Sequence, residues 1–326
     1  MVQDNLPETA AGQRSVFVAG LRREGAEVES LLLALAQAFT AGVAVQWSAM
    51  FAGVRTSRVD LPTYAFQRER FWLQPASSAG DVTAAGLGAA GHPLLGAVTA
   101  LAEGEGVLWT GRLSVRTHPW LADHVMAGAV LFPGTGFVEL AVCAGQETGC
   151  GALEELTLQA PLVLPPDGAV QVQVWVGGPQ EESGRRPVNI YSRPEHSEDM
   201  GNVWVRHATG MLSPATPAPS FDLTVWPPQG AVAVDIDGSY EQLAETGFGY
   251  GPVFQGLQAI WRRDGEVFAE VVLPEPAAQE AGLFGIHPAL LDAALHPALL
   301  DGDDGLRLPF AWSGVSLFAA GAGMLR

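Results

Sequence analysis

The sequence predicts an α+β protein in which two successive halves each combine antiparallel strands with one strongly apolar helix. From residue 92 to about 212, and again from about 221 onward, short strand-like runs predominate. Each half also contains one helix-like stretch that is apolar on nearly every side, Thr135 to Thr148 and a stretch that begins at Pro288. Such helices are normally buried, so each half can wrap a curved antiparallel sheet around its helix.

Length and charge limit the classes of function. The 326 residues, 48% of them hydrophobic, suit one large double domain or about two domains. A formal charge of -18, from 17 basic and 35 acidic residues, disfavours binding to nucleic acid or to an anionic membrane. The amino terminus has no secretory pattern, and no apolar run approaches the ~20 residues of a membrane span, so we expect a soluble protein.

The two cysteines, Cys143 and Cys150, lie seven residues apart in one helix-like stretch. That spacing separates them by about 10 Å along a helix axis, which disfavours a disulfide. Two small buried thiols fit a reducing cytoplasm, and neither is a strong candidate nucleophile.

Before the two halves, the chain changes character twice. Apolar spacing from Glu27 to Phe51 predicts a helix ending near Gly42, and the segment from Arg58 to Leu73, rich in aromatic residues, looks like an irregular connector that docks on another surface. Residues 75–91 are rich in Ala, Gly and Ser and predict a flexible linker. A second break, at 213–220, is rich in proline. Strands are expected at 107–115, 169–176, 203–212, 260–261 and 267–273.

The first reactive segment contains His124. A strand-like run carrying His124 ends at Pro133 and Gly134, and a helix follows, with Thr135 as its expected cap. Gly128 allows a close backbone approach, and the positive end of the helix can polarise a carbonyl. A core or surface histidine, next to a structural turn, is the alternative explanation of this pattern.

The second reactive segment contains Asp292 and His296, which share one face of the predicted helix and can interact. Burial on a helix rich in Leu and Ala is expected to raise the pKa of Asp292, so that it could donate a proton near neutral pH. The alternative is that Asp292 is a structural carboxylate at the start of the helix, which accepts hydrogen bonds from backbone amides. Pro297 predicts that the helix ends or kinks at His296.

Four motifs, in order, resemble those of the dehydratase domains of polyketide and fatty-acid synthases. His124, Gly128 and Pro133 match the pattern H-x-x-x-G-x-x-x-x-P. The other three matches are Gly249–Leu257 (GYGPVFQGL), His287–His296 (HPALLDAALH) and Leu308–Trp312 (LPFAW). The similarity to a dehydratase of a modular type I polyketide synthase begins near His92.

The resemblance implies a double hot-dog fold, two sheets each wrapped around a central helix, divided into 92–212, the linker 213–220 and 221–326. It implies that residues 1–74 are an acyltransferase tail with the linker that follows it. Similar domains continue beyond the LPFAW segment, so the second hot-dog is expected to be incomplete and the fold truncated at its C-terminus.

For the chemistry, the resemblance implies that His124 is the base and Asp292 the acid in the dehydration of a 3-hydroxyacyl thioester. Tyr250 and the Gly134 amide would hold the hydroxyl and the thioester, and His296 would orient Asp292. No cofactor of its own is implied. The substrate would arrive on the phosphopantetheine of an acyl carrier protein, and the partners would be neighbouring synthase domains and a second copy in a homodimer.

Other functions fit the residues less well. The glycines from Gly247 to Gly251 lack the strand and helix of a dinucleotide site. A metal site of His124, His287, Asp292 and His296 lacks a familiar spacing, and the remaining histidines, His92, His118, His196 and His207, are expected to be structural. A catalytically silent module, or a double-bond isomerase that uses the same base and acid, stays open. Tyr250 as an ordinary half-buried aromatic also stays open.

Overall fold

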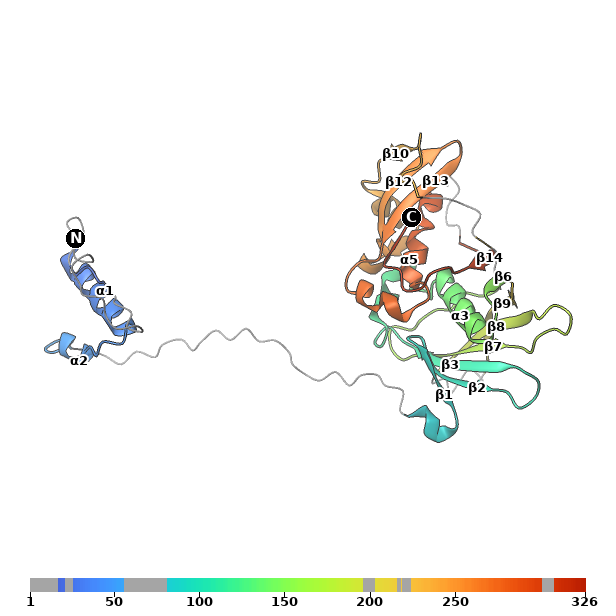
Figure 1. Ribbon diagram of the computed structural model, residues 1–326, viewed down its shortest axis with the longest axis horizontal. Coiled ribbons are helices and arrows are strands. Elements are labelled where there is room, and N and C mark those ends of the chain that lie inside the picture. Colours follow the sequence, from blue (N-terminus) through green and yellow to red (C-terminus); the bar gives the residue numbers. More distant parts are fainter. Residues whose placement is uncertain are drawn as a thin grey trace, which may run out of the picture. The chain divides into compact units, whose positions relative to one another are not determined.

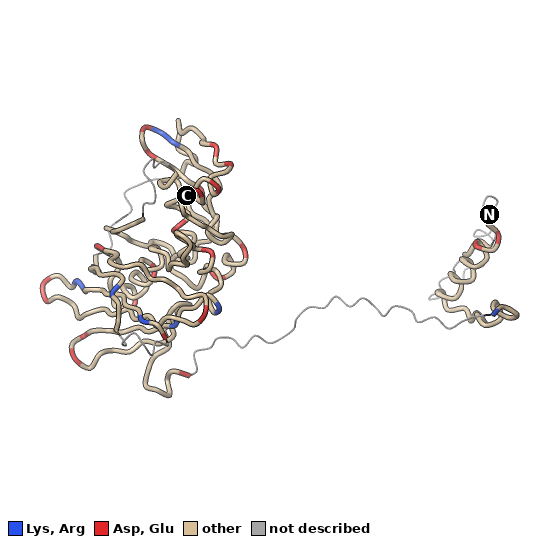
Figure 2. The backbone as a smooth tube through the Cα atoms, turned by 180° about the vertical axis from the view of Figure 1, so that it is seen from behind, with Lys and Arg blue, Asp and Glu red and all other residues tan. Residues whose placement is uncertain are grey.

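The computed structural model describes residues 17–20, 26–55, 81–195, 203–215, 218, 224–300 and 308–326. The chain divides into two compact units, Met1–Leu73 and Gln74–Arg326. Acidic positions outnumber basic ones along the drawn backbone (Figure 2), in keeping with the formal charge of -18.

The first unit contains the helices α1 (Glu27–Thr40) and α2 (Trp47–Met50). The predicted helix is therefore present, and it ends at Thr40, just before Gly42, whose φ is +95°. The rings of Phe39 and Trp47 meet edge to face at 5.6 Å, which joins the two helices. The segment expected to be a docking connector, 58–73, lies outside the described residues.

The second unit is built on an antiparallel eight-stranded sheet in the order β1-β2-β3-β7-β8-β9-β6-β14 (Figure 1). Its strands are β1 (Gly88–His92), β2 (Leu95–Ala100), β3 (Val107–Leu113), β6 (Ala152–Leu158), β7 (Val170–Val176), β8 (Arg186–Pro194), β9 (Val205–Ser213) and β14 (Ala311–Ser316). The strands predicted near 107, 169 and 203 correspond to β3, β7 and β9 and differ from them by one or two residues at their ends.

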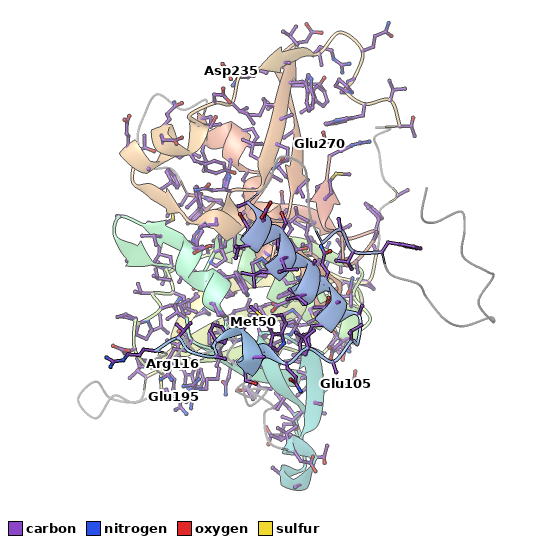
Figure 3. The ribbon with its side chains drawn as sticks, turned by 90° about the vertical axis from the view of Figure 1, so that its left-hand side faces the viewer. Met50, Glu105, Arg116, Glu195, Asp235 and Glu270 are labelled. Carbon is purple, nitrogen blue, oxygen red and sulfur yellow. The ribbon has the colours of Figure 1, made fainter. Side chains whose placement is uncertain are left out.

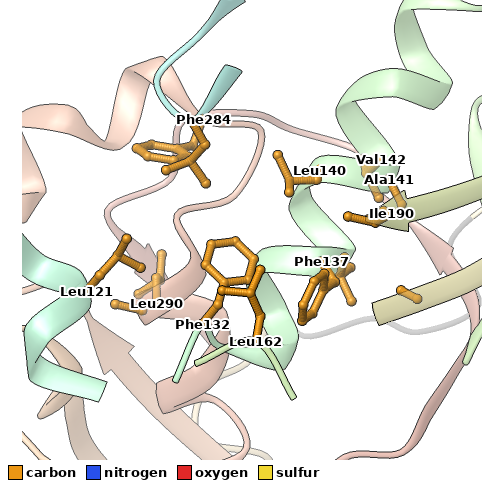
Figure 4. Packing of buried hydrophobic residues seen from close by; sticks show 14 of the residues in the cluster. Leu121, Phe132, Phe137, Leu140, Ala141, Val142, Leu162, Ile190, Phe284 and Leu290 are labelled. Atoms are coloured by element: carbon orange, nitrogen blue, oxygen red, sulfur yellow. The ribbon is translucent and has the colours of Figure 1, made fainter. Parts of the chain in front are cut away.

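Helix α3 (Gly134–Glu147) lies against this sheet and contacts β6, β7, β8 and β9. Most of its residues are buried, as the apolar composition predicts. Strand β7 alternates buried and half-buried side chains, so that its valines face inward. Figure 4 shows Phe137, Leu140 and Ala141 of α3 beside Ile190 of β8, in the core of this half.

The second half contributes a smaller antiparallel sheet, in the order β10-β12-β13-β15. Its strands are β10 (Val232–Val234), β12 (Leu257–Arg263), β13 (Glu266–Val272) and β15 (Met324–Leu325). Asp235, beside β10, and Glu270, on β13, are labelled in Figure 3. The Arg326 side chain donates to Glu270 at 3.1 Å and ties the end of β15 to β13.

The predicted second apolar helix is present as two short helices, α5 (Pro288–Ala293) and α6 (His296–Leu300), which both contact β13. The break falls where Pro297 predicts it. Pro297 is the second residue of α6, where a proline is tolerated because the first amides of a helix lack partners within it.

A third sheet joins the two halves, in the order β11-β4-β5. β4 (His124–Met126) and β5 (Ala129–Val130) come from the first half, and β11 (Phe248–Tyr250) comes from the second. In the same way β14, from the end of the chain, completes the eight-stranded sheet beside β6. Two strands of the second half therefore pair with strands of the first half, which composition alone does not indicate.

The remaining helical segments are short. They are η2 (Val82–Ala85), η3 (Pro119–Asp123), α4 (Ser239–Glu245), η4 (Pro252–Phe254) and η5 (Ala277–Leu283). η2 and β1 begin within 75–91, so the end of that expected linker forms regular structure. Among the described residues no single helix is long and apolar enough to span a membrane, although Ala277–Leu283 and Pro288–Leu300, bent by 109°, meet the criteria as a pair.

Candidate active site

A largely apolar cavity of about 300 Å³ lies where the two halves of the second unit meet. The first half contributes His124 and Gly134, and the second contributes Tyr250 and Asp292. Apolar side chains form most of the wall, among them Met126, Phe132, Phe137, Leu158, Phe248, Leu295, Leu299 and the Leu308–Phe310 segment. The LPFAW segment thus contributes to the wall through its first three residues.

His124 is buried at the start of β4, and a backbone carbonyl fixes its tautomer. Its Nδ1 lies 2.8 Å from the carbonyl oxygen of Leu131, which can only accept a hydrogen bond, so Nδ1 carries the proton of the neutral ring. Nε2 is left with a free lone pair, 3.9 Å from Oδ2 of Asp292. That arrangement suits a base with a proton donor opposite it.

A two-residue hairpin turn brings the Leu131 carbonyl to His124. The turn joins β4 to β5 through Ala127 and Gly128, whose φ angles are +47° and +81°. A Cβ on Gly128 would meet nothing within 4 Å, and Gly128 does not line the cavity. The expectation of a close backbone approach is therefore wrong, and this glycine supplies the positive φ of the turn.

Pro133, in an extended conformation, occupies the cap position of α3, and Gly134 opens the helix at the cavity wall. The first amides of a helix have no partner within it and form its positive end, so they can face a carbonyl oxygen. The expectation that Thr135 caps the helix is wrong. Its hydroxyl donates to the carbonyl of Pro288 at 2.9 Å and ties α3 to the start of α5.

Asp292 and His296 form the pair that their spacing predicts. Both are buried, and Nε2 of His296 lies 3.2 Å from Oδ2 of Asp292. Asp292 and His296 stay in contact across the break between α5 and α6, because Ala294 keeps helical backbone angles after α5 ends. His296 therefore holds one oxygen of the Asp292 carboxyl group.

Tyr250 pairs with His124 across β11 and β4, and its ring lies 4.2 Å from that of His296. Burial, reinforced by the Asp292 carboxylate, raises the pKa of Tyr250, so the phenol keeps its proton. The Tyr250 hydroxyl can therefore donate a hydrogen bond within the cavity.

The loop after Tyr250 is shaped by Asp123. Its carboxylate accepts from the amide of Val253 at 2.9 Å, and its carbonyl accepts from the amide of Gly251 at 2.7 Å. A Cβ at position 251 would overlap the Asp123 side chain, so this position requires glycine. The GYGPVF motif is therefore held against the residue that precedes His124.

Comparisons with known proteins give the family of this chain. Residues 92–193 match the family described as "Polyketide synthase dehydratase domain", and residues 218–326 match "Polyketide synthase dehydratase N-terminal domain". The dehydratase domain from the terminal module of the rifamycin polyketide synthase is 50% identical, with a TM-score of 0.69, over 75% of this chain and 88% of that one. This chain belongs to the polyketide synthase dehydratases. The α+β, double hot-dog fold that the motifs imply is thereby confirmed.

The relatives of this dehydratase include much longer proteins. Polyketide synthase GfsA of Streptomyces halstedii is 56% identical over 95% of this chain, which spans 4% of the length of GfsA. Two solved structures are described as inactive mutants of the CurK dehydratase, one with a histidine changed to phenylalanine and one with an aspartate changed to asparagine. Each is 29% identical with a TM-score of 0.62, over 72% of this chain and 84% of that one.

The other histidines that the structure describes lie outside the cavity wall. His287 caps α5 by accepting from the amide of Ala289, its ring packs on Trp120 and Phe284, and burial lowers its pKa to about 4. His207 lies between Ser192 and the Ala160 carbonyl, and His118 contacts the Pro93 carbonyl. His196 falls outside the described residues. Within the described ranges, no group of three or more His, Cys, Asp or Glu side chains is arranged to hold a metal ion.

Both thiols are free in this structure. Burial, together with Glu147 and Glu139, raises the pKa of Cys143 to about 12. Burial also raises the pKa of Cys150. Neither thiol lines the cavity, so neither is a nucleophile for the chemistry of this site.

Sequence reasoning missed the buried carboxylate of Glu139. It lies on α3 and accepts from the amides of Gly285 and Ile286 at 2.7 and 2.9 Å, and His92 lies 3.2 Å away. This Glu139 clamp joins α3 to the segment that leads into α5. An acidic residue in the middle of an apolar helix is the sequence signal that could have identified it.

Proposed function

We propose that this chain removes water from a 3-hydroxyacyl thioester and leaves an α,β-unsaturated thioester. The observation that carries the proposal is the position of two buried groups from opposite halves, Nε2 of His124 and the carboxyl group of Asp292, 3.9 Å apart in an apolar cavity. Because 3.9 Å exceeds a hydrogen-bond length, the two groups are not hydrogen-bonded to each other, and each is left to interact with the substrate.

In the proposed reaction the unprotonated Nε2 of His124 takes the α-proton. The electron pair of that C–H bond forms the double bond as the C–O bond to the β-hydroxyl breaks, and Asp292 gives its proton to the departing oxygen, so that water leaves. General acid–base catalysis of this kind contributes about 10²–10⁴-fold. The departing water carries the proton of Asp292, while the α-proton stays on His124. Transfer of that proton to Asp292 restores both groups, so the net loss is one water and the reaction balances without a cofactor.

Two further groups would place the substrate. The thioester carbonyl would lie at the start of α3, where the Gly134 amide can stabilise the negative charge that develops on its oxygen. The Tyr250 hydroxyl, which keeps its proton and lines the same cavity as Asp292, would hold the β-hydroxyl beside the acid. The apolar wall would accommodate the acyl chain and exclude water.

The named CurK mutants support this assignment of roles. Their descriptions attach inactivity to a histidine and to an aspartate, the two residue types that the cavity of this chain brings together. The same base and acid could move a double bond, but the GYGPVF and LPFAW motifs both resemble those of dehydratases.

We further propose that the substrate is delivered on the phosphopantetheine of an acyl carrier protein, within a cytoplasmic synthase that is a homodimer. Residues 1–74 would end an acyltransferase and its linker, and 92–212 and 221–326 would be the two hot-dogs. The division of the chain at Leu73 and the matched ranges support this layout.

The test is mass spectrometry of a 3-hydroxyacyl thioester on a carrier protein, or on a short pantetheine mimic, after incubation with the protein. The proposal predicts loss of the mass of one water and a product with its double bond between C2 and C3. A folded protein that leaves several such substrates unchanged would favour a silent structural module. A protein that only shifts the double bond of an unsaturated thioester would favour the isomerase.

A further inference from the structure

The far side of His296 contacts a tyrosine that the proposed reaction does not use. Tyr240, on α4, places its hydroxyl 3.3 Å from Nδ1 of His296, while Nε2 of the same ring faces Asp292 at 3.2 Å. The two rings meet edge to face at 5.6 Å. Tyr240, His296 and Asp292 thus form one chain of polar contacts that ends at the acid.

The other contacts of the Tyr240 hydroxyl indicate whether it donates to His296 or accepts from it. The amide of Leu257 donates to the hydroxyl oxygen at 3.0 Å, so the hydroxyl proton has to go to another acceptor. Two acceptors are in range, Nδ1 of His296 at 3.3 Å and the carbonyl of Phe254 at 3.5 Å, and the shorter contact is with His296. Burial raises the pKa of Tyr240 to about 12, so the proton stays on the phenol.

A proton donated to Nδ1 determines which nitrogen of His296 carries hydrogen. In a neutral imidazole one nitrogen donates and the other accepts, so an accepting Nδ1 leaves the proton on Nε2. Nε2 then donates to Oδ2 of Asp292. Oδ2 is then occupied as an acceptor, which fixes one oxygen of the carboxyl group.

His296 is not fixed in this tautomer by Asp292 alone, because a carboxyl group can accept from Nε2 or, when protonated, donate to it. The exposed fraction of His296 is 0%, so solvent does not reach either nitrogen. Tyr250, its other aromatic neighbour, approaches the face of the ring, with 4.2 Å between centroids and 36° between planes. The hydroxyl of Tyr240 is therefore the group that distinguishes Nδ1 from Nε2.

We propose that Tyr240 is a positioning residue for the dehydration, and that it acts by holding His296 in the tautomer whose Nε2 proton orients the carboxyl group of Asp292. The inference rests on the proposed function for its catalytic consequence. The hydrogen-bond geometry carries the tautomer itself, which can be measured in the resting protein.

The kinetic test is a double-mutant cycle that combines Tyr240→Phe with His296→Gln. Tyr240→Phe alone should lower kcat by about tenfold to a hundredfold, with a smaller change in KM, because the acid is misplaced while the acyl site is intact. A glutamine at position 296 can donate through its amide nitrogen and has no tautomer to select. Adding Tyr240→Phe to that variant should therefore change kcat less than threefold, roughly the error of additivity.

Tyr191→Phe is the matched control, since Tyr191 lies on β8 away from the cavity wall, and it should keep the wild-type kcat. A merely structural Tyr240 would give equal losses of kcat in both backgrounds, which would overturn the inference. Wild type without activity would instead overturn the proposed function, and the tautomer would still be testable.

The spectroscopic test uses protein labelled with ¹⁵N-histidine, whose seven histidines include His296. The His296 resonances are identified as those lost in His296→Gln. In wild type they should show a protonated Nε2 and an unprotonated Nδ1, and in Tyr240→Phe this preference should be lost or reversed. Unchanged His296 resonances in a folded Tyr240→Phe variant would overturn the inference.

Discussion

His124 and Tyr250 lie directly opposite each other on the antiparallel strands β4 and β11. One residue comes from each half of the domain, so a backbone ladder between the halves sets their separation. Their rings lie 5.8 Å apart. A change in the packing of one half is therefore transmitted to the other half through main-chain hydrogen bonds, and the base and the tyrosine stay aligned.

Tyr250→Phe is predicted to lower kcat by at least about tenfold, because one hydrogen bond to the departing hydroxyl is lost. KM should change less, since the apolar wall still binds the acyl chain. Steady-state kinetics with a pantetheine-bound substrate would measure both constants. A kcat equal to that of wild type would show that the Tyr250 hydroxyl takes no part.

Glu139→Gln is predicted to lower the free energy of unfolding by about 2 kcal/mol or more. The carboxylate of Glu139 accepts hydrogen bonds from two backbone amides, and the NH₂ group of a glutamine cannot accept, so one of these amides would lose its partner. The measurement is urea unfolding near neutral pH. Arg112→Ala is the control, since Arg112 pairs with Glu195 but its side chain is 48% exposed. That exposed pair should contribute less than about 1 kcal/mol. Equal losses for the two variants would contradict a stabilising Glu139 clamp.

His287→Asn is predicted to flatten the dependence of stability on pH between about pH 4 and 6.5. Burial lowers the pKa of His287 from 6.5 to about 4, so in this range the unfolded chain binds the proton and the folded protein does not. The contribution of His287 to the free energy of unfolding is fully present above pH 6.5 and is lost as the pH falls towards 4. The loss approaches about 3 kcal/mol.

Asparagine suits this test because it can cap α5 as His287 does, and it does not titrate. The free energy of unfolding of both proteins is measured across the range. The difference between them should change with pH in favour of wild type at the upper end. A difference that is constant from pH 4 to 6.5 would contradict the account.

Much of the fold could be predicted from local pattern. The alternation of valines marks β7, the apolar run marks α3 within a residue at each end, and Pro297 marks the break between α5 and α6. These signals are local, because hydrophobic periodicity and proline geometry act within one element. The catalytic candidates His124 and Asp292 came from ordered motifs, and the structure brings them to one cavity.

The features that sequence did not predict are pairings between distant segments. Thr135 looks like a helix cap in the sequence, but its hydroxyl donates to the carbonyl of Pro288 in the other half. The carbonyl of Leu131 fixes the tautomer of His124, and a backbone carbonyl leaves no mark in the sequence. The pairing of β11 and β14 with strands of the first half is long-range, and local periodicity does not encode it.

The central claim is that His124 and Asp292 act as one base–acid unit, and a double-mutant cycle on dehydration tests it most directly. His124→Ala, Asp292→Asn and the double variant are assayed by mass spectrometry on a substrate that wild type dehydrates. When two groups act in one step, the losses of activity caused by mutating each of them do not add. Each single variant should therefore lose about as much activity as the double variant. Additive losses, or a single variant that retains most of the wild-type rate, would contradict the claim.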